Sequence, residues 1–139
     1  MTNNKPHILN KGEEINNTYE VSFFIGQGAF GEVYRVKHMG FDENLALKVF
    51  KDENIKTIDR DSVYNEGRIL FKLNHPNLVR VFDLNKFYKN DKVFNYITMS
   101  YVSGESLSQL VSRKIRLDIP VATSIMIDLL KGLASAHKN

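Results

Sequence analysis

The sequence predicts an α+β fold in which an antiparallel sheet precedes most of the helical structure. Three segments within the first fifty residues, at 19–25, 31–38 and 45–50, alternate between two faces with the period of two that is typical of strands. Two similar segments follow in the middle of the chain, and the last third has apolar residues at spacings of three and four. Strands that are segregated from most of the helices indicate the α+β class.

The first three predicted strands are joined by short turns and form an antiparallel meander. In the first strand, Tyr19, Val21, Phe23 and Ile25 fall on one predicted face. A glycine turn follows it, and turn residues at 39–44 separate the second strand from the third.

One helix is predicted over 59–73, where Val63, Glu66, Leu70 and Leu73 share a face. It ends before Pro76, which disfavours helical backbone at the preceding residue. Two further strands, 78–87 and 92–102, are joined by the turn "YKND". Two helices then follow, a short one over 106–114 and a long one over 119–139. The complete prediction is a five-stranded antiparallel sheet with one helix, followed by two C-terminal helices.

The composition limits the classes of function. The 139 residues are the size of one domain, and the net charge of +3 comes from scattered rather than massed basic residues, so we expect no nucleic-acid partner. Because there is no cysteine, the chain has neither a disulfide framework nor a thiolate metal site. No apolar run approaches the ~20 residues of a membrane helix. We therefore expect a cytoplasmic protein without a membrane segment, with residues 1–18 as a polar leader.

The stretch "IGQGAFGEVYRV" contains the pattern G-x-G-x-x-G at Gly26, Gly28 and Gly31. A dinucleotide-binding loop of this pattern opens a helix, whereas the residues after Gly31 alternate as a strand does. There is also no G-K-[ST] sequence of the Walker type. Two interpretations stay open: glycines needed only for a tight hairpin, or glycines that let backbone amides approach a polyphosphate.

Lys48 lies in the otherwise apolar strand "ALKVF". A buried ammonium group without a partner is costly, so this lysine either points to water at a sheet edge or faces phosphate oxygens and pairs with a carboxylate. Glu66, on the apolar face of the predicted helix, is the natural partner.

With these residues in place, the sequence resembles the eukaryotic-type (Hanks-type) protein kinase family, and its leader resembles that of prokaryotic Ser/Thr kinases. The motifs that carry the resemblance are "IGQGAFGEVYRV", "ALKVF", "NEGRILFKLNHPNLVRVFDL" and "YITMSYVSGESL", in the family's order and spacing. The resemblance implies an ATP-binding N-lobe over 19–102, then the exit of the hinge and the first C-lobe helices over 103–139.

The resemblance also implies roles for individual residues. Lys48 would hold the α- and β-phosphates and Glu66 would pair with it. Val33 and Ala46 would sandwich the adenine, Met99 would be the gatekeeper, and the backbones of Ser100 and Val102 would bind the adenine edge. Ser106 would lie near the ribose, and Leu70 and Val81 in the hydrophobic spine. The remaining ATP-contacting residues would be those of the loop: Ile25, Gly26, Gln27, Gly28, Ala29, Phe30, Gly31 and Glu32.

The 139 residues contain no His-Arg-Asp loop and no Asp-Phe-Gly motif. The catalytic base and the Mg²⁺ ligands of the family are thus absent, and we expect no useful phosphoryl transfer by this chain alone. Two functions stay open: the ATP-binding lobe of a Ser/Thr kinase that phosphorylates protein substrates, or a pseudokinase or stand-alone nucleotide-binding or interaction module. The intact glycines, Lys48 and Glu66 favour the first. The apolar stripe of the last helix predicts self-association.

Overall fold

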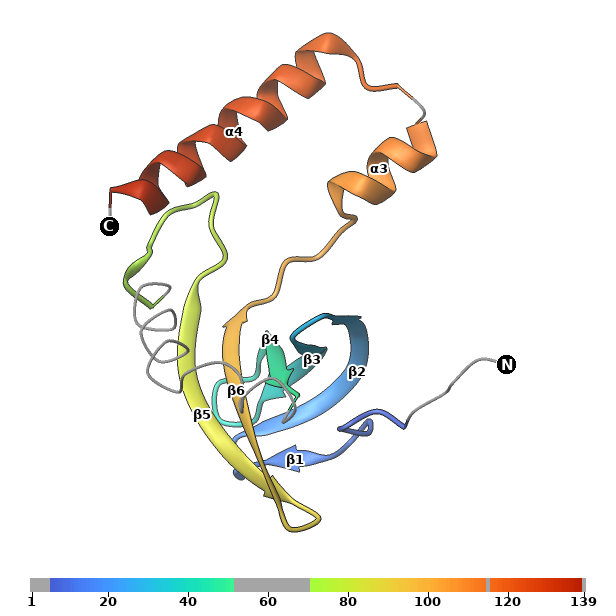
Figure 1. Cartoon of the computed structure of the whole chain (residues 1–139), viewed down its shortest axis with the longest axis vertical. Helices are drawn as coiled ribbons and strands as arrows, with labels where there is room; N and C mark the ends of the chain where they lie inside the picture. Colours follow the sequence, from blue (N-terminus) through green and yellow to red (C-terminus); the bar gives the residue numbers. More distant parts are fainter. Residues whose placement is uncertain (1–5, 52–70, 115, 139) are drawn as a thin grey trace.

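The computed structural model describes residues 6–51, 71–114 and 116–138. Figure 1 shows a curved sheet, from which the chain continues into two helices that lie beyond one end of the sheet. The elements are β1 (Glu14–Ile15), β2 (Tyr19–Gly28), β3 (Gly31–His38), β4 (Glu43–Phe50), β5 (Val81–Lys89), β6 (Lys92–Ser100), α3 (Leu107–Lys114) and α4 (Ile119–His137).

The sheet has six strands in the order β1-β2-β3-β4-β6-β5, and every pair is antiparallel. The five predicted strands and the two C-terminal helices are confirmed. The prediction missed β1, a two-residue strand within the range 1–18 that was expected to be a polar leader. Two residues are too short for an alternating pattern to be visible in a sequence.

The faces predicted for the first strand are only half right. Tyr19 and Val21 are buried, but the side chains of Phe23 and Ile25 are 42% and 45% exposed. The cause is a pair of register shifts in β2, between Val21 and Phe23 and between Phe24 and Gly26. Each irregularity moves the following side chains to the opposite face, which simple alternation cannot anticipate.

The hydrophobic core lies on one face of the sheet, which we call the core face. It is formed by side chains of β2, β3, β4, β5 and β6 together with the N-terminal residues Leu9 and Ile15, and the largest fully buried members are Tyr34 and Tyr96. The alternate residues of the same strands, among them Val33, Ala46 and Lys48, define the opposite face, which we call the Lys48 face.

The turns and caps follow the local sequence. Asn90 and Asp91 join β5 to β6 with φ values of 50° and 59°, the left-handed conformation that two-residue hairpins require. Before α3, the backbone N–H of Ser106 donates to Gln109 Oε1 at 2.7 Å and the backbone N–H of Gln109 donates to Ser106 Oγ at 3.2 Å, a reciprocal helix cap.

The long helix α4 contacts the loop that precedes β5. The Nδ2 atom of Asn77 donates to the backbone carbonyl of Asp128 at 2.7 Å. Gly132, the one buried residue of α4, packs so closely that an added Cβ would lie 3.0 Å from the Asn77 carbonyl oxygen. The predicted helix at 59–73 lies outside the described residues except for its last residues, of which 71 and 72 are helical.

Candidate functional site

The glycine stretch forms the turn between β2 and β3, as the alternation on both sides of it predicted. Gly28 and Gly31 are the last pair of the ladder, and Ala29 and Phe30 form the tip. A Cβ on Gly31 would lie 2.0 Å from the carbonyl oxygen of Val49, so this glycine is required for β3 to approach β4. A Cβ on Gly26 or Gly28 would meet no heavy atom of the described residues within 4 Å. Among these residues, the space beside the two glycines is therefore free.

The strand register gathers the predicted site residues on the Lys48 face. Opposed residues of neighbouring antiparallel strands share a face. One row runs across four strands through Gly26, Val33, Lys48 and Ile97. The next row runs through Phe23, Arg35, Ala46 and Met99. Val33, Ala46, Lys48 and Met99, which are up to 66 positions apart in the numbering (99 − 33), thus form one surface beside the glycine turn.

Lys48 is part-buried between two aromatic rings. Its Nζ atom lies 5.9 Å from the ring centroid of Phe30 at the turn and 5.6 Å from that of Phe50 on the same strand. Within residues 6–51, 71–114 and 116–138, no carboxylate forms an ion pair with it. Its predicted partner, Glu66, lies outside the described residues. The ammonium group therefore lies near two aromatic rings, on the face beside Gly26 and Gly28.

The segment after β6 contains the predicted hinge. The backbone N–H of Ser100 donates to the Arg80 carbonyl at 2.8 Å, and Ser100 Oγ accepts from the Arg80 N–H at 3.1 Å. Val102 lies beyond the strand and is 70% exposed. The Ser106 hydroxyl, assigned to the ribose by resemblance, is engaged in the cap of α3.

Arg35 is a member of this surface that the sequence reasoning missed. Its guanidinium carbon lies 5.4 Å from the ring centroid of Phe23 and 5.2 Å from that of Tyr101, so the cation is held between two rings. Its buried Nε has no hydrogen-bond partner in the part of the chain that the structure describes. Alternation could have found it, because Arg35 is two residues from Val33 on the same strand.

Glu32 is the predicted loop residue that the structure separates from the others. It is opposite Val49 in the ladder, its residue is 5% exposed, and its carboxylate lies on the core face. The backbone N–H of Ile8 donates to Glu32 Oε2 at 3.0 Å, and the Tyr34 hydroxyl also donates to this oxygen. The carboxylate therefore contacts the N-terminal segment rather than the space beside the glycines.

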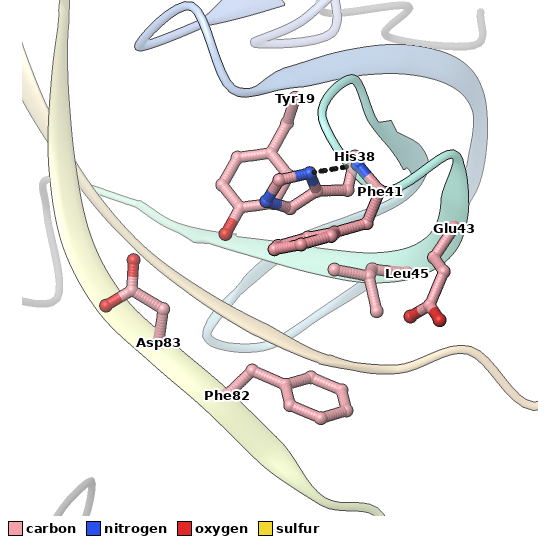
Figure 2. A pocket seen from close by; sticks show the side chains of 7 residues that line it. All are labelled: Tyr19, His38, Phe41, Glu43, Leu45, Phe82 and Asp83. Atoms are coloured by element: carbon pink, nitrogen blue, oxygen red, sulfur yellow. Dashed lines mark hydrogen bonds between the residues drawn. The ribbon is translucent and has the colours of Figure 1, made fainter.

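A separate pocket of about 370 Å³ lies on the core face, where the end of the β2–β3 pair meets β5 (Figure 2). Its lining consists of Tyr19, His38, Phe41, Glu43, Leu45, Phe82 and Asp83. The Nδ1 atom of His38 accepts the backbone N–H of Phe41 at 3.2 Å, which is the dashed line in the figure. None of the predicted site residues that the structure describes lines this pocket.

Comparison with known proteins agrees with this arrangement. The model of the protein kinase domain matches residues 19–139. The chain belongs to the protein kinase domain family. The resemblance to prokaryotic Ser/Thr kinases is also confirmed by the relatives and the solved structures.

Two bacterial relatives illustrate the likeness. The chain is 34% identical over 130 residues to a Clostridium perfringens protein named "Probable serine/threonine-protein kinase", with 92% of this chain and 18% of that protein covered. It is 31% identical over 129 residues to the serine/threonine-protein kinase pkn3 of Myxococcus xanthus, with 91% and 23% covered. The chain therefore spans about a fifth of the length of these relatives.

Among solved structures, the kinase domain of Mycobacterium tuberculosis PknI matches with a TM-score of 0.74 at 29% identity. The match covers 94% of this chain and 52% of the PknI chain. The expectation that no apolar run approaches the length of a membrane helix is wrong for α4. By length and composition alone its 19 residues could cross a membrane, a test that core helices of soluble proteins also pass. The kinase-domain match includes all of α4.

Proposed function

We propose that the chain is the ATP-binding part of a protein serine/threonine kinase, which in the complete enzyme transfers a phosphoryl group from ATP to Ser or Thr of a protein substrate. One observation carries this proposal: Lys48 lies without a carboxylate partner, among the described residues, on the face beside two glycines that leave open space. A cation and exposed backbone amides next to free space suit a polyphosphate.

The other residues of the Lys48 face and of the glycine loop would each contact a different part of ATP. Val33 and Ala46 would pack against one side of the adenine, with Met99 next to Ala46, because all three belong to adjacent rows of the same surface. The backbone carbonyl of Ser100 and the N–H of Val102 would bind the adenine edge. The loop residues Ile25, Gln27, Ala29 and Phe30 would close over the phosphates, and Phe30 already lies beside Lys48.

Phosphoryl transfer also needs Mg²⁺ and a catalytic base. Among the described residues, no group of three or more His, Asp or Glu side chains is arranged to hold a metal ion. We therefore propose that these 139 residues bind ATP in the cytoplasm without transferring phosphate at a useful rate. A pseudokinase or an interaction module is the alternative function, and it predicts the same absence of transfer.

Calorimetric titration of ATP into the chain tests the proposal, with Lys48→Met as the variant. Hydrogen bonds to charged groups contribute about 1.5–3 kcal/mol, so the variant is expected to bind ATP about 10- to 100-fold more weakly. Lys92→Met, which removes an exposed cation at the β5–β6 turn, serves as the matched control and should bind as the original chain does. Absence of ATP binding by the original chain would refute the proposal.

We also propose that the chain self-associates through α4. Met126, Leu129, Leu130 and Leu133 are between 45% and 54% exposed, which is unusual for four apolar residues on one helix. Light scattering should find a dimer or larger species, and Leu130→Glu should shift it toward monomer. The control, Lys131→Glu, changes an exposed charge of the same helix and should leave the mass unchanged. A monomeric original chain at high concentration would contradict this.

A further inference from the structure

Glu32 is a buried carboxylate directly after the last glycine of the loop. It is 5% exposed, and its side chain lies on the core face, away from the space in which a phosphate would bind. Burial of a carboxylate is costly unless hydrogen bonds replace the water it loses. The partners of Glu32 therefore show what holds this end of β3 in place.

Those partners come from the N-terminal segment and from Tyr34. The N–H of Ile8 and the hydroxyl of Tyr34 both donate to Glu32 Oε2, and the N–H of Leu9 donates to the Tyr34 oxygen at 3.0 Å. His7 stacks on Phe24 of β2 with 4.0 Å between ring centroids, and its Nδ1 lies 3.8 Å from Glu32 Oε2. Burial and the hydrogen bond to Glu32 raise the pKa of Tyr34, which keeps its hydroxyl a donor.

The same segment is fixed at its other end to a distant strand. Lys89, at the end of β5, donates from Nζ to the Ile8 carbonyl and to Glu13 Oε2, each at 2.7 Å. The backbone of Gly12 and Glu13 is also bonded to Val21 of β2, at 2.8 Å and 2.9 Å. Residues 7–13, which we call the brace, thus connect β5 and β2 to the base of the glycine turn.

The turn is held by its backbone: Gly28 is paired with Gly31 at the end of the ladder, and the N–H of Lys51 donates to the Phe30 carbonyl at 3.2 Å. Among the described residues, an added Cβ on Gly26 or Gly28 has no neighbour within 4 Å, and β2 is irregular on the approach to the turn. The residues 27–30 are exposed. Glycines allow more backbone conformations than other residues do, and phosphate binding requires one of these conformations. A rigid attachment at Glu32 therefore limits the conformations that the turn explores.

We propose that the brace positions the glycine turn for phosphate binding. Glu32 is the positioning residue, because it connects the brace to the strand that follows the turn. This inference rests on the proposed binding of ATP to the Lys48 face. It predicts that neutralising Glu32 weakens ATP binding, which is opposite to the effect expected from charge alone. Removing a negative charge near a triphosphate favours binding by Coulomb's law, whereas loss of the brace weakens it.

The test compares ATP with adenosine, which lacks the phosphates. Glu32→Met removes the acceptor and is expected to weaken ATP binding by about tenfold, since the N–H of Ile8 and the hydroxyl of Tyr34 lose their partner. Adenosine binding should stay unchanged. Glu32→Gln keeps one acceptor oxygen and should recover part of the loss. Lys89→Met, remote from the turn, should weaken ATP by about threefold and leave adenosine unchanged.

Glu20→Met, which neutralises an exposed glutamate of β2, is the matched control and should not alter either affinity. Equal weakening of ATP and adenosine by Glu32→Met would indicate general loosening of the fold and would overturn the proposal. Unchanged or tighter ATP binding would overturn it too.

Hydrogen exchange of the Gly26, Gly28 and Gly31 amides, measured without nucleotide, separates this proposal from the proposed function. Exchange should be faster in Glu32→Met and in Lys89→Met than in the original chain, whether or not ATP binds. If the original chain binds no ATP, the proposed function fails. If amide exchange in these variants also equals that of the original chain, the proposal for the brace fails as well.

Discussion

The two faces of β4 differ clearly although their residues alternate along one strand. Leu47 and Val49 on the core face are fully buried, whereas Lys48 between them is part-buried, with its ammonium group near the rings of Phe30 and Phe50. The core face is closed by the N-terminal segment and by β5 and β6. Because alternate residues of one strand carry the two roles, the stability of the fold and the binding of a ligand can be changed independently.

The largest expected effect comes from Gly31→Ala. A methyl group there would lie 2.0 Å from the backbone oxygen of Val49, which cannot move without separating β3 from β4. We expect a loss of about 4 kcal/mol or more in the free energy of unfolding, measured by urea denaturation. Gly28→Ala, which meets open space, is the control and should cost less than about 1 kcal/mol. Equal stability of both variants would show that β3 and β4 are not packed as described.

Leu47→Ala changes the core face alone. Removal of a fully buried leucine side chain is expected to lower the free energy of unfolding by about 2–5 kcal/mol. Under conditions in which the variant remains folded, its ATP affinity should match that of the original chain. Val93→Ala, at a position 39% exposed, is the matched control and should cost well under half as much. A small effect of Leu47→Ala on stability would contradict the assignment of the core face.

Lys48→Met should have the opposite effects on the free energy of unfolding and on ATP affinity. The free energy of unfolding should change by no more than about 0.5 kcal/mol, because the ammonium group has no ion pair among the described residues. The ATP affinity should fall as predicted above. Together with Leu47→Ala, one residue earlier, this variant separates the two faces by urea denaturation and calorimetry. A large loss of stability in Lys48→Met would mean that the lysine is structural.

The smallest expected effect is on the pH dependence of the free energy of unfolding, through Glu13 in the brace. Partial burial alone would raise the pKa of Glu13, but hydrogen bonds from Lys89 and Asn10 and the charge of Lys89 hold it below its ordinary value of 4.5. The lowered pKa stabilises the folded state above pH 4.5, and this contribution is lost as the pH falls through the folded-state pKa. Its size is expected to be under about 1 kcal/mol. The acid limb of the urea stability curve should flatten in Glu13→Gln, and an identical limb would contradict the pairing.

Much of the fold could be predicted because it depends on alternation, and the strand on each side of the glycines identified a hairpin. The roles of Val33 and Ala46 came from the resemblance to the kinase family, and the strand register puts both residues on the same face as Lys48. The bulges of β2 could not be predicted, since an extra residue leaves no mark on composition, and they reverse the face of Phe23. Alternation places Glu32 on the same face as Tyr34, but its hydrogen-bond partner Ile8, 24 residues away, could not be predicted from local pattern.

The central claim is that ATP binds to the Lys48 face, and amide chemical shifts measured during an ATP titration test it most directly. We predict that the amides of Gly26, Gly28, Gly31 and Val102 shift and saturate together, while those of Leu9 and Tyr96 on the core side stay in place. Shifts confined to the pocket of Tyr19, His38 and Asp83, or spread evenly over the sheet, would contradict the account.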